Sequence, residues 1–421
     1  MGVIRKKDAE LKKLVVIGGG AAGFFCAVNA ARLNPHLQVT ILEKGTKLLS
    51  KVKVSGGGRC NVTHHGLSIT EMLKKYPRGQ QLLKKSFHQF FVPDTVAWFK
   101  ERDVTLKTEA DGRMFPTTDN SQTIIDCLLK EADKYNVQVA TGQEVMALYP
   151  GSTSPWLLEL KGGKLEPAEY VCIASGGYSQ MQKFHWLQQL GHSIAAPVPS
   201  LFTFNMPRHP ITELMGVTVQ GVQVKIAGSK FMESGPLLIT HWGFSGPSIL
   251  RLSAWGAEWL AEKNYQFQVI VNWLPEFNEH TLREAWQGFR SAHGKQKIYN
   301  KSPFQLPVRL WNYLLETAGI LPGMRWADIP AKEQNKFIKI LTAMEFDISG
   351  KTTFKEEFVT CGGVQLNEID ANTMQSKIKE GIYFAGEVLN VDGITGGFNF
   401  QNAWTSGWVA ATAIASAATG A

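Results

Sequence analysis

Short apolar runs alternate with a longer helical segment over the first 45 residues. Residues 14–17 (LVVI) are an apolar run that ends at a glycine, and residues 38–42 (QVTIL) are a second short run. Between them, residues 21–33 have the length and spacing of a helix that stops at Asn34-Pro35. This order predicts a strand, a helix and a second strand, the βαβ unit of nucleotide-binding domains.

The alternation of helical segments and short apolar runs continues as far as residue 177. Residues 71–107 look helical and basic, and residues 123–135 have helical spacing. Three short segments are typical of strands, namely residues 137–140, 156–160 and 170–174, and the last of them runs into Ser175-Gly-Gly.

The character of the chain changes near residue 195. Four prolines between residues 197 and 210 indicate loops, and residues 217–226 alternate across Gly221, which predicts a hairpin. Residues 265–273 also alternate, whereas residues 279–345 are helical. After Gly350 the turn-and-strand pattern returns, and the alanine-rich residues 403–419 predict a packed helix rather than a membrane span.

These shifts predict an α/β protein in which one nucleotide-binding domain is interrupted by an insert of about 150 residues. The nucleotide-binding domain would comprise residues 1–194 and 349–421. The insert would be β-rich over residues 195–275 and helical over residues 276–348.

Composition supports a globular protein and leaves the excess of glycine to be explained. The 421 residues include 40 glycines, and 44 Lys and Arg against 36 Asp and Glu give a net charge of +8. The five cysteines are odd in number and form no CxxC, so we expect neither disulfides nor a metal site, and we expect a cytoplasmic protein. Residues 14–31 are uncharged, but Gly18–Gly20 interrupt them, which disfavours a signal peptide or membrane helix.

The first predicted turn carries a dinucleotide-binding fingerprint. Gly18, Gly20 and Gly23 match G-x-G-x-x-G between the strand and the helix, and Glu43 ends the second strand 20 residues later. We expect Gly18 to form the tight turn, Gly20 to admit a pyrophosphate, and Gly23 to let the helix pack. Glu43 would accept hydrogen bonds from a ribose diol.

Two later elements favour FAD over NAD. Residues 170–177 and 381–387 are strands that end in glycine, and the second is followed by residues 392–399 (DGITGGFN). A cofactor that touches both ends of the chain must be long, as FAD is. A helix from about Asn402 would aim its positive N-terminal end at the flavin.

At these motifs the chain resembles the bacterial FAD-dependent oxidoreductases grouped with aminoacetone oxidase and a bile-acid-pathway reductase. The matching residues are 51–63 (KVKVSGGGRCNVT), 240–247 (THWGFSGP) and 381–404. The resemblance implies a Rossmann-like, glutathione-reductase-like three-layer ββα domain that binds FAD. It also implies an inserted β-barrel-like subdomain and a small helical subdomain that cover the flavin. His64 and Asn390 depart from the usual pattern, so substrate preference is not carried over.

The cofactor contacts that we predict include Lys51 and Arg59 as neutralising charges and Asn61 as a hydrogen-bond partner of the ring. The full predicted set is Gly18, Gly20, Ala22, Gly23, Glu43, Lys44, Lys51, Gly58, Arg59, Asn61, Val145, Ser175, Gly176, Gly386, Glu387, Asp392, Gly396, Gly397, Asn399 and Phe400.

No catalytic residue is assigned. His64, His65 and His241 are candidate proton donors, although a single histidine is more often structural. Cys60 has no partner at CxxC spacing and is expected to be an inert thiol. Trp242 and Phe244 could wall a substrate pocket or belong to the core.

The sequence leaves the reaction partners open. There is no second G-x-G-x-x-G, so NAD(P)H would visit the flavin transiently, or oxygen would reoxidise a flavin that the substrate has reduced. We expect a small-molecule substrate and no membrane partner, and predict no oligomeric state. Eight basic residues could instead contact nucleic acid, but no RNA-binding motif accompanies them, which disfavours that alternative. A non-catalytic FAD-binding scaffold is a third alternative. The eight are Lys74, Lys75, Arg78, Lys84, Lys85, Lys100, Arg102 and Lys107.

Overall fold

The computed structural model describes residues 11–152, 154–353 and 359–419. The chain divides into two compact units. The described part of the first comprises residues 11–152, 154–199 and 359–419, and that of the second comprises residues 200–353. The finer division at residues 194/195, 275/276 and 348/349 stays a prediction.

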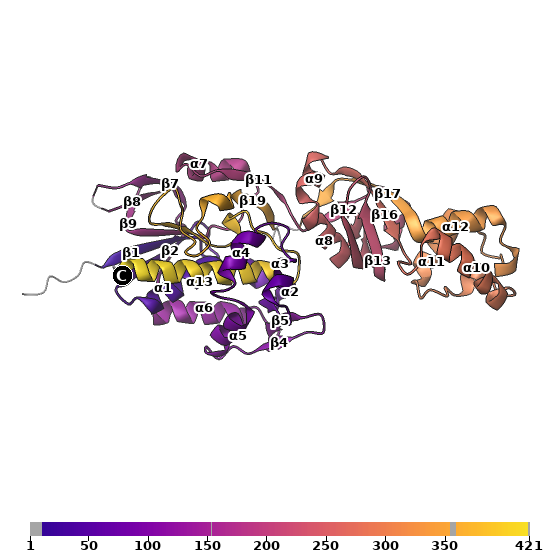
Figure 1. The fold of residues 1–421 in the computed structure, drawn as a ribbon, viewed down its shortest axis with the longest axis horizontal. Helices are drawn as coiled ribbons and strands as arrows, with labels where there is room; N and C mark the ends of the chain where they lie inside the picture. Colours follow the sequence, from indigo (N-terminus) through magenta and orange to yellow (C-terminus); the bar gives the residue numbers. More distant parts are fainter. Residues whose placement is uncertain (1–10, 153, 354–358, 420–421) are drawn as a thin grey trace, which may run out of the picture. The chain divides into compact units, whose positions relative to one another are not determined.

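A five-stranded parallel sheet is the centre of the first unit (Figure 1). Residues 14–17 of β1 are at most 6% exposed, because a central parallel strand is covered on both faces. The order of the sheet confirms the predicted βαβ unit and places the C-terminal strand at its edge. That order is β20 (Ile382–Phe384), β10 (Tyr170–Ile173), β1 (Lys12–Ile17), β2 (Leu37–Glu43) and β6 (Gln138–Thr141).

Helices and a small antiparallel sheet complete a three-layer ββα arrangement around this sheet. Helix α1 (Ala21–Leu33) packs against α13 (Phe398–Thr419) and α6 (Gln122–Lys134). A Cβ at Gly407 would lie 2.9 Å from the carbonyl oxygen of Ala22, so the glycine lets α13 approach α1 closely. The antiparallel sheet has the order β7 (Val145–Pro150), β8 (Trp156–Leu160) and β9 (Leu165–Ala168).

Residues 71–107, which we predicted to be helical, form shorter helices followed by a strand. Pro77 and Gly79 separate α3 from α4, and Gly79 has a φ of +90° that favours glycine. Residues 106–108 pair with β5, so long-range pairing overrides the helical pattern there. The elements are α3 (Ile69–Leu73), α4 (Gln80–Ser86), α5 (Val92–Lys100) and β4 (Leu106–Thr108).

The remaining elements of the first unit lie in its connecting segments. They are α2 (Ser50–Gly58), β3 (Thr63–His64), β5 (Arg113–Pro116), η1 (Met181–Phe184), α7 (His185–Gln189), β11 (Ile194–Pro199), β19 (Thr360–Val364), η5 (Leu366–Glu368) and η6 (Gly386–Val388). Strands β3, β5 and β4 form one antiparallel sheet, and β11 pairs with β19.

A seven-stranded antiparallel sheet forms one part of the second unit, and its strands come from both before and after the helical segment. No pairing joins its end strands among the described residues, so the expected barrel-like subdomain is an open sheet. The terminal strand β18 has only two residues, and both pair with β12. The order is β17 (Met344–Ser349), β16 (Gln266–Asn272), β13 (Thr218–Ile226), β14 (Met232–Thr240), β15 (Gly243–Ser245), β12 (Thr203–Asn205) and β18 (Lys351–Thr352).

The predicted hairpin turn at Gly221 is wrong. Residues 218–226 are one strand, β13, with a register shift between Val219 and Val222. An extra residue in a bulge changes the phase of the alternation without reversing the chain, and Gly221 supplies the φ of +65°. The hairpin partner of β13 is the following strand, β14.

The helical character predicted for residues 279–345 is confirmed as far as residue 343. The helices and turns of this unit are η2 (Pro210–Leu214), α8 (Pro247–Trp255), α9 (Ala257–Glu262), α10 (Glu279–His293), η3 (Ile298–Asn300), α11 (Val308–Ala318), η4 (Trp326–Asp328) and α12 (Ala331–Ala343). In the part of the chain that the structure describes, no helix is both long enough and apolar enough to cross a membrane.

Candidate functional site

The turn between β1 and α1 contains glycines with two different steric roles. A Cβ at Gly18 would collide with the carbonyl oxygen of Ala174, and a Cβ at Gly23 would collide with that of Gly18. A Cβ at Gly20, by contrast, would meet nothing within 4 Å. Gly20 is also the N-cap of α1, and no side chain caps the helix there. Open space at uncapped helix N–H groups fits an anionic group such as a pyrophosphate.

Glu43 is held in place beside this turn. Its carboxylate accepts a hydrogen bond from the backbone N–H of Gly19 (2.8 Å) and another from that of Gly45 (2.7 Å). The neighbouring Lys44 lies over the ring of Tyr178, 5.2 Å from its centroid. The backbone of residues 142–143 bonds to residues 45 and 43, which brings the start of β7, and thus Val145, to the same end of β2.

The ends of β10, β19 and β20 meet next to the same turn. A Cβ at Gly177 would collide with the side-chain oxygen of Thr360 and lie 3.0 Å from Glu387 Oε1. Glu387 accepts a hydrogen bond from the Thr360 N–H (2.8 Å) and forms an ion pair with Lys51. Gly176 has a φ of +73° and open space at its Cβ position. The structure therefore brings Lys51, Glu387 and the neighbours of Ser175 together.

Gly386 joins this cluster to the two long helices. A Cβ there would lie 2.8 Å from the Cβ of Ala22 in α1. Its backbone N–H donates to Ser406 Oγ of α13 (2.8 Å). The predicted contacts Ala22 and Gly386 are thus direct neighbours.

The segment after Val54 forms a turn of three left-handed glycines. Gly56, Gly57 and Gly58 have φ values of +58°, +69° and +83°, and Gly57 and Gly58 face open space. Backbone N–H groups in such a run can form a concave anion site. The side chain of Arg59 turns to a different partner: it pairs with Glu109 at 2.6 Å and lies 4.0 Å from the ring centroid of Phe115. Its predicted role as a free neutralising charge therefore receives no support.

Asn61 ties this segment to the C-terminal loop. With the amide oriented by its hydrogen-bond network, its nitrogen donates to Thr63 O (3.0 Å) and its oxygen accepts from Gly397 N–H (2.9 Å). A Cβ at Gly397, where φ is +90°, would lie 2.6 Å from Thr63 O. Asn399 bonds both backbone groups of Gly393, at 2.8 and 2.9 Å. The side-chain amides of Asn61 and Asn399 are therefore hydrogen-bonded to the backbone of this part of the protein, and these bonds hold the loop in place.

Helix α13 begins at Phe398, not at about Asn402 as predicted. The glycine pair 396–397 ends the loop, and the helix starts as soon as these left-handed residues are passed. Phe400 stacks on Trp404 with ring centroids 5.7 Å apart. The N-terminus of α13 thus lies directly against the loop that carries Gly396 and Gly397.

Two buried residues at this cluster each hold a side-chain oxygen that has no hydrogen-bond partner among the described residues. The oxygens are Thr360 Oγ1 and Asn402 Oδ1, and their residues are 0% and 2% exposed. Asn402 lies one helical turn before Ser406, which binds Gly386. Buried polar groups are rarely left unsatisfied, so the pair fits a bound group with hydroxyl donors. Neither oxygen is among the contacts predicted from the sequence, although the helix was expected to begin at about Asn402 and to point its N-terminus at the flavin.

The candidate proton donors do not converge on this cluster. His64 Nδ1 lies 3.2 Å from Gly396 O, and its ring stacks on Phe398. Burial lowers the pKa of His64, so its neutral form is favoured. His65 and His241 are exposed, and His241 belongs to the second unit. Phe244 is fully buried and belongs to the hydrophobic core of the second unit.

Cys60 agrees with the expected inert thiol. It is fully buried, and burial raises its pKa to about 12, so the thiolate does not form at neutral pH. Among the described residues no three His, Cys, Asp or Glu side chains lie together as metal ligands.

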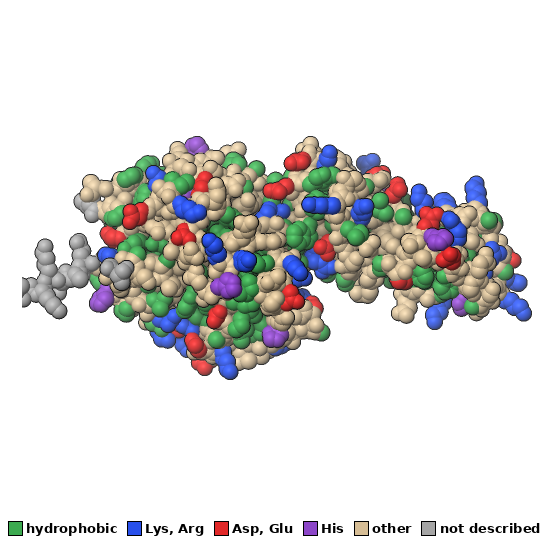
Figure 2. Space-filling model, in the orientation of Figure 1, with side chains coloured by type: hydrophobic (Ala, Val, Ile, Leu, Met, Phe, Trp, Pro, Cys, Tyr) green, Lys and Arg blue, Asp and Glu red, His purple; other side chains and the backbone are tan. Residues whose placement is uncertain are grey.

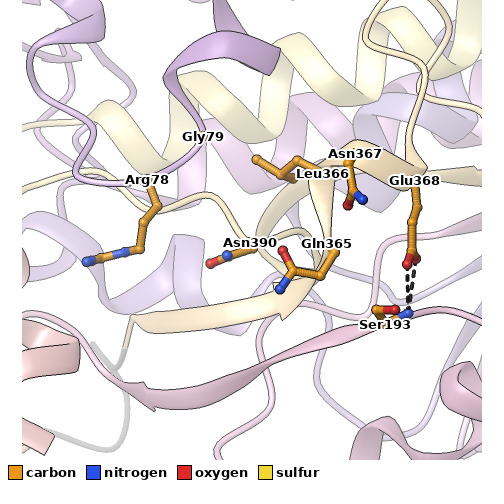
Figure 3. Close-up of a pocket in the computed structure, with 8 residues that line it drawn as sticks. All are labelled: Arg78, Gly79, Ser193, Gln365, Leu366, Asn367, Glu368 and Asn390. Atoms are coloured by element: carbon orange, nitrogen blue, oxygen red, sulfur yellow. Dashed lines mark hydrogen bonds between the residues drawn. The ribbon is translucent and has the colours of Figure 1, made fainter. Parts of the chain in front are cut away.

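A groove of about 620 Å³ borders the C-terminal loop in the first unit (Figure 3). Glu368 lies at one side, where its carboxylate accepts from the Ser193 N–H at 3.0 and 3.1 Å. Arg78 lies at the other side, and it forms a two-point ion pair with Asp392. The predicted contact Asp392 is therefore fully buried against a protein cation. The lining residues are Arg78, Gly79, Ser193, Gln365, Leu366, Asn367, Glu368 and Asn390.

The sequence as a whole matches a known family model, described as the HI0933-like protein Rossmann domain, over residues 12–413. The chain belongs to the HI0933-like family. The resemblance drawn from the three motifs is thereby confirmed.

Curated relatives of this HI0933-like chain match nearly its whole length. It is 30% identical over 406 residues to the ribosomal RNA dihydrouridine synthase of Escherichia coli (strain K12), covering 94% of this chain and 96% of the relative. It is 26% identical over 413 residues to the 3-dehydro-bile acid delta(4,6)-reductase of Clostridium scindens, covering 96% and 99%.

Solved flavoenzyme structures share the fold of the HI0933-like chain. The 3-ketosteroid-delta4-(5alpha)-dehydrogenase of Rhodococcus jostii RHA1 has a TM-score of 0.51 at 14% identity, with 97% of this chain and 98% of that one covered. A flavocytochrome c3 fumarate reductase also has a TM-score of 0.51, at 16% identity, with 97% and 79% covered. The fold is that of flavoprotein oxidoreductases with a Rossmann-type FAD-binding domain.

Proposed function

We propose that this protein is an FAD-dependent reductase of carbon–carbon double bonds conjugated to a carbonyl group. The observation that carries the cofactor is the open cradle at the ends of β1, β10 and β20. There, Gly20 and Gly176 face open space, and Thr360 and Asn402 hold unpartnered buried oxygens. FAD would supply a hydride from N5 of its reduced ring.

The residues of the cradle suit successive parts of FAD. The N–H groups at Gly20 would bind the pyrophosphate, and the oriented carboxylate of Glu43 would bind the adenosine ribose. Thr360 and Asn402 would accept hydrogen bonds from hydroxyl groups of the ribityl chain. The N-terminus of α13 would stabilise negative charge on the reduced ring.

The names of the two curated relatives support the reaction class. Dihydrouridine differs from uridine by two hydrogens across the C5–C6 bond, which is conjugated to a ring carbonyl. A delta(4,6)-reductase of a 3-dehydro-bile acid likewise saturates bonds conjugated to the 3-oxo group. In both reactions a hydride adds to the carbon β to the carbonyl and a proton adds to the α carbon. NAD(P)H, as a transient partner, would supply the two electrons.

RNA is the second candidate for the substrate, beside the small molecule that the sequence analysis favours. The observation that supports RNA is the 30% identity to a ribosomal RNA dihydrouridine synthase over 94% of this chain. Both substrates present the same acceptor chemistry to the flavin. They differ in the surface that a substrate must contact outside the site.

The test begins with the absorbance spectrum of the purified protein. We expect bands near ~450 nm and release of FAD on denaturation. Anaerobic addition of NADH and of NADPH should then bleach the flavin. A 3-oxo-4-ene steroid, a uridine-containing RNA, and oxygen are offered in turn to the reduced enzyme. Reoxidation by the steroid or the RNA, with two hydrogens added to the product, supports the proposal. If only oxygen reoxidises the flavin, and small amines reduce it, the protein is an oxidase.

A further inference from the structure

We infer that an exposed cationic edge in the second unit, formed by Lys295, Lys297 and Arg325, binds the phosphate backbone of an RNA substrate. This inference rests on the proposed function in its RNA form. It adds a contact surface outside the unit that carries the flavin cradle. A small-molecule reductase has no need of such a surface, so the edge separates the two substrate candidates.

Backbone pairing holds two of the cations opposite each other. Lys297 and Arg325 are partners in an antiparallel bridge. The Ile298 N–H donates to Met324 O (3.0 Å), and the Trp326 N–H donates to Gln296 O (3.1 Å), which fixes the register. Side chains directly opposite in such a pair lie on the same face. The bridge therefore presents two positive charges side by side.

No carboxylate within the described residues forms an ion pair with any of these three cations, although acidic residues pair with other cations of the same unit, such as Arg283 and Arg251. All three side chains are exposed. Like charges placed directly opposite destabilise a pair of strands, because their repulsion is not offset. A polyanion would relieve this repulsion, and binding would release the counterions condensed on its backbone.

A cluster of buried aromatic residues supports the edge from behind. Ile298 and Trp326, the neighbours of Lys297 and Arg325, are at most 2% exposed. Trp326 packs on Trp286 with ring centroids 5.2 Å apart, and Trp311 Nε1 donates to Ile298 O (2.9 Å). The backbone that carries the cations is therefore anchored, and less ordering entropy is lost when a ligand binds.

Helix α12 adds further positive charge to this part of the unit. Lys332, Lys336 and Lys339 are exposed at spacings of four and three residues, so they share one helix face, while Phe337 and Ile338 face the core. Figure 2 shows several Lys and Arg side chains over the part of the second unit that carries α10, α11 and α12. The resulting field would attract a polyanion before any specific contact forms.

The basic segment singled out in the sequence is a weaker candidate. Arg102 pairs with Glu131 at 2.7 Å, Arg78 pairs with Asp392, and Lys107 pairs with Asp119. Carboxylates of the protein already balance these three charges. The exposed lysines of α3–α5 remain as the rival RNA-binding surface, and the experiment includes them.

The test measures the binding of a fluorescein-labelled, uridine-containing stem–loop RNA by anisotropy over a salt series. The test variant is K295Q/K297Q/R325Q. The matched control is K225Q/K230Q/K263Q, which removes three exposed charges from the same unit. A third variant, K74Q/K84Q/K85Q, is the rival arm of the test, because it removes charges from the rival surface at α3–α5. Each lost phosphate contact lowers the slope of log K against log salt by ~0.7–0.9, so we expect the test variant to lose about two units of slope. That change equals an affinity loss of about a hundredfold at 0.1 M salt if the two proteins bind equally at 1 M.

The inference is overturned if the test variant binds like its control, or if only the rival arm weakens binding. The single variant K297Q, with an expected loss of about 0.7–0.9 in slope, serves as the test if the triple variant does not fold. Flavin absorbance and reduction by NAD(P)H are recorded for every protein. If the RNA does not bind but an enone still reoxidises the flavin, the edge is wrong and the reductase proposal stands. If the protein holds no flavin but the test variant loses RNA affinity, the edge stands and the reductase proposal falls.

Discussion

Arg78 and Asp392, 314 positions apart in the chain, form a two-point ion pair in which the carboxylate is fully buried. Arg78 leads into α4, and Asp392 follows η6 in the loop that is predicted to contact the flavin. The pair therefore fastens that loop to the helices that follow β3.

Removing the cation should destabilise the protein strongly. Arg78→Leu leaves a buried carboxylate without this partner, and breaking buried pairs typically costs about 3–5 kcal/mol. Urea denaturation followed by tryptophan fluorescence measures the effect. The control is Lys107→Met at the exposed pair with Asp119, where we expect a loss below ~1 kcal/mol. If the free energy of unfolding falls equally in the two variants, the buried Arg78–Asp392 pair stabilises the protein no more than the exposed pair does.

Two glycines of the first turn should respond differently to alanine. At Gly23 a Cβ would collide with Gly18 O, so Gly23→Ala should lower the stability of the FAD-free protein by a few kcal/mol. At Gly20 the φ is −95° and the Cβ position is open, so Gly20→Ala should fold normally. Its methyl group would occupy the space proposed for the pyrophosphate, and FAD affinity should fall. Thermal unfolding without FAD and fluorescence titration with FAD separate the two effects. Unchanged FAD binding by Gly20→Ala would remove the pyrophosphate from this turn.

The unpartnered hydroxyl of Thr360 should matter only when the cofactor is bound. Thr360→Val removes a buried oxygen that has no partner among the described residues, so the FAD-free protein should be as stable or slightly more stable. If the oxygen accepts a hydrogen bond from FAD, affinity should fall about two- to tenfold. The matched control is Thr342→Val, whose hydroxyl bonds Ile338 O within α12, and it should leave FAD affinity unchanged. A Thr360→Val protein that binds FAD as tightly as the native protein would contradict the contact.

Stability should fall when the pH drops below about 6.5, and His192 should contribute to that fall. Burial lowers the pKa of His192, and the nearby Glu368 only partly opposes this. The unfolded chain therefore takes up a proton at a higher pH than the folded one, and stability is lost as the pH falls through the unfolded value of about 6.5.

The measurement is the free energy of unfolding between pH 5.5 and pH 8, a range in which Glu368, whose own pKa is lowered, stays ionised. His192→Gln should show a shallower dependence on pH than the native protein. The exposed His88→Gln serves as the control and should keep the native slope. A His192→Gln profile parallel to the native one would assign the effect to other groups.

Local patterns were enough to predict the central strands of the first unit, the helix between β1 and β2, and the family of the chain. The apolar runs around residues 14–17, 38–42 and 170–174 became neighbouring strands, because parallel strands that are buried on both faces need continuous apolar segments. The glycine spacing after β1 could be predicted because it is a recognisable motif in which Gly23 packs on Gly18 within one turn, although the close approach of Gly18 to Ala174 is a long-range contact. The bulge at Gly221 could not, since one inserted residue and a true turn both shift an alternating pattern.

The sequence by itself determined the parallel sheet, the glycine turns at its strand ends and the membership of the family, since backbone sterics and apolar periodicity act over a few residues. Only the tertiary structure decided which charges are already balanced. Arg59, Arg78 and Arg102 look alike in the sequence, yet each meets a carboxylate from another segment. It also decided that Thr360 and Asn402 keep unpartnered oxygens beside Gly386, while Lys297 and Arg325 stand opposite each other. Such pairings depend on which distant segments the packed core brings together, and no local pattern records them.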